Sequence, residues 1–183
     1  MRNFLRHDPD VIMVGEIRDR ETAGIAVESA LTGHLLLSTL HTNTAATTVT
    51  RLLDLGVEPY LLRASLLAVM SQRLVRLTCP HCREVEDVSA HMRETLGIHA
   101  AEVFYRGRGC VQCEGLGVYG RQAVYELLMM TPRLRELVVP GAEADTIHRV
   151  AMEEGMTPIT QAAVILARSG AIALAEAWRV RAD

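Results

Sequence analysis

Hydrophobic and polar positions near the start of the chain follow a strand–helix–strand pattern. Residues 11–14, VIMV, form an apolar run that is too short for a helix and rich in residues that suit a buried strand. Residues 20–31 carry apolar side chains at helical spacing, and Gly33 follows them as a stop signal. A second apolar run, LLLST, covers residues 35–39. The pattern predicts a βαβ unit, and the carboxyl ends of its parallel strands are where open α/β sheets bind ligands.

The next stretch of the chain is predicted to be helical. Asn43 and Thr44 are typical of a helix cap, and the helix that they begin should end at Gly56. Pro59 suits the first position of another helix, because that position leaves its backbone N–H unbonded in any case. We expect this apolar helix to run from residue 60 to about residue 77, with a wide buried stripe along it.

The pattern becomes polar at the first cysteine. Between residues 79 and 113 we expect a short helix over 89–96 and a strand near 103–105. The glycine-rich stretch 115–121 predicts a tight turn, and residues 123–128 predict a strand.

The remainder of the chain is predicted to be helical. Thr131-Pro132 and Thr157-Pro158 each pair a capping residue with a proline and so predict the start of a helix. A last short helix holds Trp178. No catalytic pattern is visible in this part, which we expect to be a packing module.

Charge and composition narrow the classes of function. The chain has 183 residues and a net charge of −3, so nothing indicates the basic surface of a nucleic-acid binder. No apolar run approaches the ~18 residues of a membrane span, and the N-terminus lacks the apolar region of a signal peptide. We therefore expect a cytoplasmic protein that associates with a membrane only through partners.

The four cysteines fall in two C-x2-C pairs, Cys79 with Cys82 and Cys110 with Cys113. This spacing predicts a tetrahedral zinc site with four thiolate ligands, because each pair forms a tight turn that points both sulfurs at one ion. Two alternatives stay open: chance pairs of reduced cysteines, and an iron–sulfur or rubredoxin-like site. His81 lies inside the first pair, but four sulfurs already complete the coordination shell.

Two polar side chains follow the ends of the predicted strands: Glu16 after the first and His41 after the second. Polar side chains at the carboxyl ends of parallel strands lie where open α/β sheets bind ligands. The plainer interpretation of Glu16 is a surface carboxylate at a strand end. A metal shared by His34 and His41 is disfavoured, because their odd offset along an extended strand puts them on opposite faces.

Several motifs in a fixed order resemble one family. They are DPDVIMVGEIRD from residue 8, TGHLLLSTLHTN from residue 32, Gln72-Arg73-Leu74, the two cysteine pairs, and a Gly-x-Tyr-Gly-Arg turn that ends at Arg121. Over essentially the whole chain they resemble the ATPases that power type II secretion and type IV pilus assembly. The cysteine segment points to the secretion and pilus-extension branch rather than the retraction branch.

The resemblance implies a Walker B box and a histidine box. In the first, Glu16 would act on the attacking water, directly or through the Mg²⁺ shell. Gly15 stands where a standard Walker B box has an aspartate, as is usual in this family. The TGHLLLSTLHTN stretch resembles the histidine box, which implies that His41 lies near the γ-phosphate.

Further contacts to the nucleotide are expected from Gly15, His34, Arg73 and Arg121. Arg73 also fits the solvated face of a helix, and that plainer interpretation stays open. The cofactors that the resemblance implies are ATP, Mg²⁺ and Zn²⁺. The partners are further copies of the chain in a homo-hexamer and the inner-membrane platform of a secretion or pilus machine, without nucleic acid.

The fold class that the resemblance implies is α/β: a partial P-loop (RecA-like) parallel sheet with a small tetracysteine zinc-binding insertion and a C-terminal helical module. We expect the partial P-loop core, with the Walker B and histidine boxes, over residues 1–78. The zinc-binding insertion would cover 79–114, and a strand-plus-helical module 115–183. Because parallel sheets are normally covered on both faces, the strands of such a partial core should expose apolar surface.

Three family elements are missing from this sequence. Members carry an N-terminal domain, a Walker A loop and an arginine-bearing acidic box upstream of the Walker B box, whereas this sequence starts a few residues before it. The sequence also contains no lysine, which a Walker A loop needs for the β- and γ-phosphates and which Schiff-base chemistry needs as a nucleophile. The enzyme class therefore rests on the family, and we expect that this chain alone does not hydrolyse ATP.

Two other interpretations stay open beside the ATPase. One is a non-catalytic zinc-bearing interaction module, or a decayed or split ATPase fragment, that docks on an intact partner ring. The other is a zinc-ribbon nucleic-acid binder, which the acidic net charge and the single tryptophan among few aromatic residues disfavour.

Overall fold

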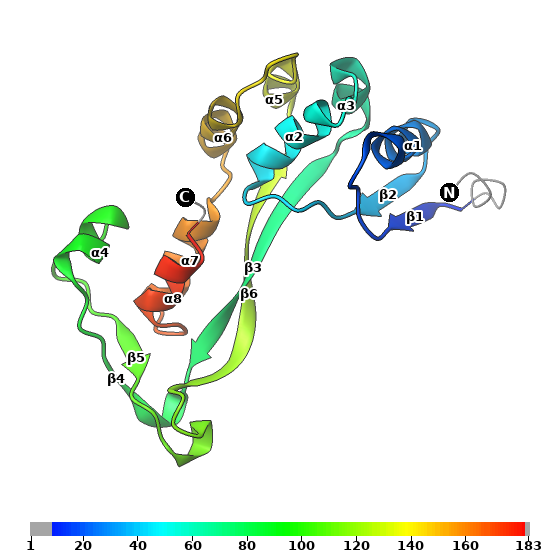
Figure 1. The fold of residues 1–183 in the computed structure, drawn as a ribbon. Helices are drawn as coiled ribbons and strands as arrows, with labels where there is room; N and C mark the ends of the chain where they lie inside the picture. Colours follow the sequence, from blue (N-terminus) through cyan, green and yellow to red (C-terminus); the bar gives the residue numbers. More distant parts are fainter. Residues whose placement is uncertain (1–8, 182–183) are drawn as a thin grey trace. The chain divides into compact units, whose positions relative to one another are not determined.

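The computed structural model describes residues 9–181, whose helices and strands follow one another in the order shown in Figure 1. Asp8, the first residue of the expected Walker B motif, lies outside the described residues. Contacts divide the chain into two compact units. The first comprises the residues up to Met70 together with Leu127–Met156, and the second comprises Ser71–Glu126 together with the residues from Thr157 on. Two of the three segments expected from the sequence, 1–78 and 115–183, cross this division, whereas 79–114 lies within the second unit. The three-part organisation stays a prediction.

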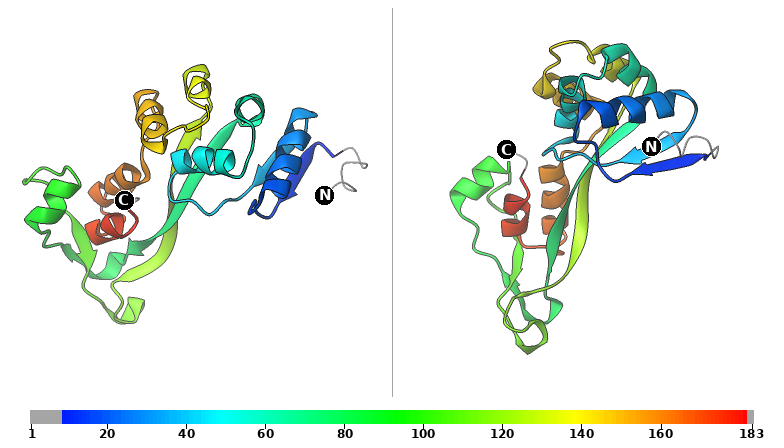
Figure 2. Two further views of the ribbon diagram at one scale, coloured as in Figure 1. Left: turned by 45° about the horizontal axis from the view of Figure 1, so that its top comes forward. Right: turned by 45° about the vertical axis from the view of Figure 1, so that its right-hand side comes forward.

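The predicted βαβ unit is present in the first unit. The strands β1 (Val11–Val14) and β2 (Leu35–Ser38) pair in parallel. The helix α1 (Arg20–Leu31) connects them and lies along one side of the pair (Figure 2). Four large apolar side chains at alternate positions of the two strands are exposed, as expected for a partial core: Val11, Met13, Leu35 and Leu37. The α/β class drawn from the sequence is confirmed.

Local signals set the ends of α1 and of the next helix. Asp19 caps α1 by accepting a hydrogen bond from Thr22 N–H at 2.8 Å. Gly33, with a φ of 103°, turns the chain from α1 into β2. Thr44 caps the helix α2 (Ala45–Asp54), as the sequence predicts.

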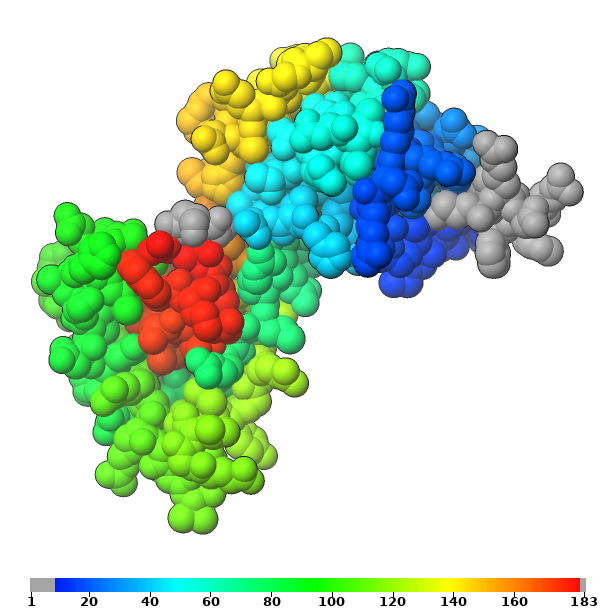
Figure 3. Space-filling view, in the orientation of Figure 1, coloured from blue at the N-terminus to red at the C-terminus, as the bar shows by residue number. Residues whose placement is uncertain are grey.

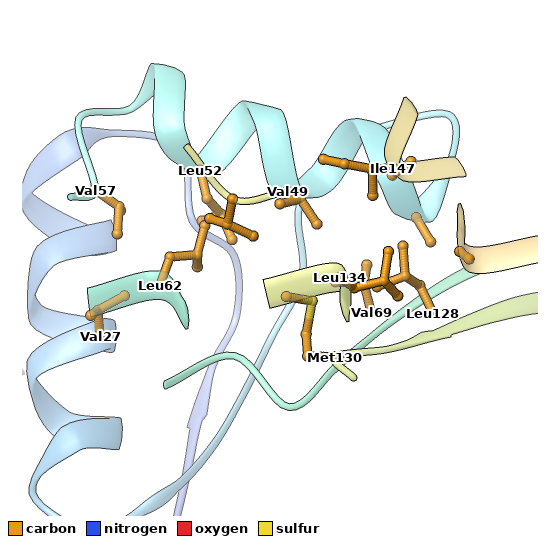
Figure 4. Packing of buried hydrophobic residues seen from close by; sticks show 14 of the residues in the cluster. Val27, Val49, Leu52, Val57, Leu62, Val69, Leu128, Met130, Leu134 and Ile147 are labelled. Carbon is orange, nitrogen blue, oxygen red and sulfur yellow. The ribbon is translucent and has the colours of Figure 1, made fainter. Parts of the chain in front are cut away.

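One hydrophobic core holds the first unit together (Figure 4). The amphipathic helices α2, α5 (Pro132–Glu136) and α6 (Ala144–Glu153) contribute their apolar faces to it. Its buried side chains include Val27, Val49, Leu52, Val57, Leu62, Val69, Leu128, Leu134 and Ile147. The start of α5 at Thr131-Pro132 is confirmed, because the Thr131 hydroxyl accepts a hydrogen bond from Leu134 N–H at 3.2 Å.

The prediction of one long helix over residues 60–77 is wrong. The helix α3 covers only Pro59–Ser65, and the strand β3 covers Ala68–Thr78. Apolar residues in this stretch also fit a period of two, and that period is the one observed: buried Val69, Ser71 and Val75 alternate with exposed Met70, Gln72 and Leu74. The pairing partner that decides between the two periods lies far along the chain, where the local pattern cannot reveal it.

That partner is the strand β6 (Val118–Met129). Met130 N–H donates to Leu67 C=O at 2.9 Å at one end of the ladder, and Cys79 N–H donates to Gly117 C=O at 3.0 Å at the other. These two bonds show that β3 and β6 run antiparallel. The strand predicted over 123–128 is confirmed, and it begins earlier than expected, at Val118, inside the stretch 115–121 that was predicted to be a turn.

The helix α8 (Leu174–Arg179) lies beside β3 in the second unit. Its Glu176 carboxylate accepts the Arg76 N–H of β3 at 2.9 Å. Its Arg179 Nη2 donates to the Leu74 C=O of β3 at 2.8 Å. Side chains of α8 therefore form hydrogen bonds with backbone groups on the edge of β3 that faces away from β6. Among the residues described, no other strand pairs with that edge.

The cysteine segment contains little regular structure. The strands β4 (Arg83–Val85) and β5 (Tyr105–Gly107) form an antiparallel pair. The predicted helix over 89–96 is confirmed as α4 (Ala90–Thr95), whereas the strand predicted near 103–105 begins two residues later. The reason is that Phe104, which the prediction placed in the strand, is fully buried in a core instead.

The second core joins the cysteine segment to the C-terminal helices. Phe104 and Ile98 pack there with apolar side chains of α8 and of the helix α7 (Ile159–Arg168). Figure 3 shows α8, in red, against the green segment that includes α4. The helix predicted to start near Thr157-Pro158 is present as α7, but Thr157 does not cap it: Pro158 is the N-cap residue, without a side-chain bond. The buried Glu126 carboxylate accepts the Ile159 N–H at 3.1 Å instead. Among residues 9–181, no helix is both long and apolar enough to cross a membrane.

Candidate functional site

The two expected catalytic residues lie together at the carboxyl ends of β1 and β2. Nε2 of His41 lies 3.1 Å from Oε2 of Glu16, within hydrogen-bonding distance. The Glu16 side chain is 28% exposed and the His41 side chain 83% exposed. A carboxylate and an imidazole that touch at an accessible sheet edge can bind and orient a water molecule or a hydrated cation.

Backbone and side-chain bonds between the two strand ends hold this geometry. Thr39 Oγ1 donates to Gly15 C=O at 2.7 Å, and Ile17 N–H donates to Thr39 C=O at 2.9 Å. These bonds continue the parallel pairing of β1 and β2 past the last residues of the strands. Sequence reasoning did not single out Thr39, although it lies inside the TGHLLLSTLHTN motif, four residues after the start of β2.

A guanidinium contacts the same carboxylate. Arg18 Nε forms an ion pair with Glu16 Oε1, so both carboxylate oxygens of Glu16 are engaged, one by Arg18 and one by His41. Ser38, the last residue of β2, carries a buried hydroxyl that has no hydrogen-bond partner among the residues that the structure describes. The strand ends thus offer both a held carboxylate and an unused hydroxyl.

His34 lies at the opposite end of β2 from His41. Its Nδ1 lies 2.9 Å from Ser29 C=O and 3.0 Å from Thr32 Oγ1, at the turn between α1 and β2. The structure therefore does not bring His34 to the Glu16–His41 pair, and its ring serves the turn. Its role as a contact to a nucleotide stays a prediction.

The two arginines expected to contact a nucleotide lie in the second unit. Arg73 is on β3 and donates from Nη1 to the Gln72 C=O at 3.1 Å. Arg121 is exposed near the start of β6. Their part in nucleotide binding, like that of Gly15, stays a prediction.

The four cysteines meet in the second unit. Their sulfur atoms all lie within 4.8 Å of one another: Sγ–Sγ distances are 3.9 Å for Cys79 and Cys110, 3.8 Å for Cys82 and Cys113, and 3.7 Å for Cys110 and Cys113. Four sulfurs at ~2.3 Å from a tetrahedral zinc ion stand about 3.8 Å apart. The cysteines therefore fit a zinc ion in both ligand set and geometry.

Backbone N–H groups point at these sulfurs. Burial raises the pKa of Cys113, but N–H donors from Cys110 and Gly117, each at 3.2 Å, outweigh it and lower that pKa to about 6. For Cys82 burial dominates over the Gly109 N–H and raises the pKa to about 12. A bound cation would favour the thiolate at every one of these positions.

The backbone segments at Gly107 and Gly117, which flank the second cysteine pair, pack closely against each other. A Cβ atom on Gly107 would lie 1.9 Å from the Gly117 carbonyl oxygen, and one on Gly117 would lie 2.2 Å from the Gly107 carbonyl oxygen. Both positions therefore require glycine. The GLG sequence that was interpreted as a turn has this additional packing role.

Comparison with known proteins assigns the chain to a family. The chain matches the model of the family described as "Type II/IV secretion system protein" over residues 1–179. It is 46% identical over 180 residues to the type IV pilus assembly ATPase PilB of Thermus thermophilus, covering 96% of this chain and 20% of that protein. It is 51% identical over 147 residues to the type II secretion system protein E of Klebsiella pneumoniae, covering 80% of this chain and 30% of the relative. The chain thus spans less than a third of these relatives.

Solved structures share its fold. The crystal structure of the pilus retraction motor PilT with bound ADP matches with a TM-score of 0.67 and 29% identity, over 100% of this chain and 42% of that chain. The Legionella pneumophila ATPase DotB matches with a TM-score of 0.67 at 24% identity, over 98% of this chain and 38% of that chain, which supports the fold alone. Because the family model covers nearly all of the sequence, the chain belongs to the Type II/IV secretion system protein family.

Proposed function

We propose that this chain is the part of a secretion or pilus-assembly ATPase that carries the Walker B and histidine boxes. The observation that supports it is the Glu16–His41 contact at 3.1 Å, at the sheet edge where α/β proteins bind ligands. Glu16 would orient the attacking water, directly or through a Mg²⁺ ion, and His41 would lie near the γ-phosphate. The names of the relatives PilB and PilT, an ATPase and a motor with bound ADP, support a nucleotide as the ligand of the whole protein.

The proposal extends to the whole protein of which this chain covers a part. Such a protein would bind ATP and Mg²⁺ with a phosphate-binding loop from outside this sequence, with Gly15, His34, Arg73 and Arg121 as further contacts. It would work as a homo-hexamer in the cytoplasm, attached to an inner-membrane platform, and would drive pilus or pseudopilus assembly and protein export. The match to a pilus assembly ATPase and to a type II secretion protein supports this role.

Zn²⁺ is the metal that we propose for the four cysteines. The ligand set of four sulfurs and the 3.7–3.9 Å spacings support it. When bound, the ion would supply fold stability rather than catalysis, because four protein ligands leave no open coordination position.

A polypeptide of this sequence alone should not turn over ATP. It contains no lysine, so it lacks the ammonium group that holds the β- and γ-phosphates in P-loop ATPases. A Mg²⁺-dependent phosphate-release assay on the purified chain should give no turnover above background. Turnover at the rate of an ordinary ATPase would contradict this part of the proposal.

A chimera tests the catalytic role directly. The matching fifth of Thermus thermophilus PilB would be replaced by this chain, which aligns with it over 96% of its length. The chimera should hydrolyse ATP with Mg²⁺, and Glu16→Gln should slow hydrolysis at least about 100-fold, the scale of general acid–base catalysis. Glu28→Gln, which changes an exposed carboxylate on α1 of the same unit, is the matched control and should be neutral.

Two results would count against the proposal. Hydrolysis that survives Glu16→Gln unchanged would remove Glu16 from the catalytic machinery. A chimera that assembles and binds zinc but is inactive, beside an active parent PilB, would favour the non-catalytic zinc-bearing module instead.

A further inference from the structure

A pocket in the second unit lies beside the turn that carries Cys79 and Cys82 and contains none of the four cysteines in its lining. Its volume is about 420 Å³, within the range of small-molecule pockets. The end of β3, the start of the cysteine segment, β6 and the loop after α7 line it. The side chains that matter below are Leu77, Thr78, Pro80, Arg83, Tyr119 and Ala171.

The guanidinium of Arg83 is held in this pocket but makes no hydrogen bond. Its Cζ lies 3.9 Å from the centre of the Tyr105 ring, so one face is stacked. Its end lies against Gly170, where an added Cβ would be 2.0 Å from Nη2. Among residues 9–181 the Arg83 side chain has no hydrogen bond and no ion pair. A guanidinium has five N–H donors, so the held group has its donors available to a ligand.

The rest of the lining fits an anion with an apolar body. None of the lining residues is acidic, so the pocket carries the one positive charge of Arg83. Thr78 is only 9% exposed, and its hydroxyl has no partner in the described part of the chain. Leu77, Pro80 and Ala171 supply apolar wall.

A purely structural role for Arg83 predicts a different geometry. Gly170 follows the C-terminus of α7, where arginine side chains commonly donate hydrogen bonds to the last helical carbonyls. Arg83 donates to none of them. The stack on Tyr105 fixes the Arg83 guanidinium without using its N–H donors. Because the side chain is already ordered, less conformational entropy is lost when a ligand binds.

We propose that this pocket binds a carboxylate that is attached to a small apolar group, of the kind that a polypeptide presents at its C-terminus or on an acidic side chain. A single guanidinium fork matches a carboxylate through two parallel N–H bonds and balances its one negative charge. The Thr78 hydroxyl donates a further bond, and the apolar group lies on Leu77 and Ala171. This site is independent of the proposed ATPase activity.

The test is a chemical-shift titration of the zinc-loaded full chain by NMR. The probes are N-acetyl-leucine, which mimics a chain terminus, its neutral amide as the matched control, and N-acetyl-glutamate α-amide, which mimics an acidic side chain. N-acetyl-leucine should shift the backbone amides of Ser169, Gly170 and Ala171, and the neutral amide should not. Comparison of the two carboxylates shows which source the pocket prefers.

Substitutions identify the group responsible. Arg83→Gln should weaken binding at least about tenfold, because it removes hydrogen bonds from a charged group. Thr78→Val should weaken binding about fivefold, because it removes one hydrogen bond from a neutral group. Arg63→Gln changes an arginine of the first unit that is outside the pocket and should leave binding unchanged. If Arg83→Gln does not fold, Arg83→Lys keeps the charge without the fork and should also weaken binding.

Three outcomes overturn the proposal. They are no shift with either carboxylate, equal shifts with the carboxylate and its amide, and binding that persists in folded Arg83→Gln or Arg83→Lys. Shifts confined to Cys110–Cys113, which lie outside the pocket lining, would also overturn it, since they would indicate contact with the metal instead of the pocket.

Discussion

Glu176 should contribute stability that depends on pH. Its side chain is 4% exposed, and its carboxylate accepts bonds from Arg76 and Arg179. Burial raises the pKa of this carboxyl, but the bonds from the two guanidinium groups outweigh burial and lower the pKa from 4.5 to about 2. Glu176→Gln keeps the size of the side chain and removes the charge that these bonds require.

The size of the effect follows from that pKa. The full shift corresponds to about 3 kcal/mol of folding free energy. Because Arg76 and Arg179 are half exposed, solvent screens their charges, and we expect a loss of about 2 kcal/mol for Glu176→Gln at pH 7. Since the folded pKa lies below the ordinary value, the contribution is complete above about pH 4.5 and disappears as the pH falls towards 2.

Urea unfolding followed by Trp178 fluorescence measures this difference, because Trp178 lies on the same helix. Glu153→Gln is the matched control: Glu153 also pairs with two arginines, Arg133 and Arg149, but its side chain is 42% exposed. Its substitution should cost much less than that of Glu176 at pH 7.

Two results would refute the reasoning on Glu176. One is a stability difference between wild type and Glu176→Gln that stays constant from pH 7 to pH 3. The other is a cost at pH 7 no larger than that of Glu153→Gln.

Three further changes have definite expected outcomes. Chelation of the metal should shift the emission of Trp178 to the red, because the cysteine segment and α8 share one core; unchanged emission would show that they are not coupled. Gly170→Ala should destabilise more than Gly141→Ala in thermal melts: both glycines have positive φ, which costs about 1 kcal/mol for alanine, but only Gly170 lies against Arg83. Glu86→Gln should cost about 1 kcal/mol or more in urea unfolding, because the buried carboxylate caps the first N–H groups of α8; a neutral result would exclude the cap.

The sequence predicts the elements whose signals are local. Asp19, Thr44 and Thr131 each bond an N–H three residues ahead, so the helix starts that they mark can be identified from neighbouring residues alone. The βαβ unit follows in the same way from short apolar runs on both sides of one amphipathic stretch. The positions of Glu16 and His41 at one edge then follow from the parallel pairing.

The sequence does not reveal what depends on distant partners. The apolar positions of β3 fit a helix and a strand equally, and only β6 decides between them. Glu86 and Glu126 cap α8 and α7 from segments far away in the chain, so nothing near either residue marks it as buried. The pocket around Arg83 likewise needs three separate segments to be brought together before it exists.

The contacts between α8 and β3 have a consequence for solubility. An outer strand with free N–H and C=O groups is a template on which strands of other molecules can add. Glu176 accepts the N–H of Arg76, and Arg179 donates to the C=O of Leu74. Because these backbone groups are already bonded, α8 disfavours edge-to-edge aggregation. A polypeptide cut before Leu174 would lose this protection along with part of its core, and its β3 would be open to growth of intermolecular β-sheet.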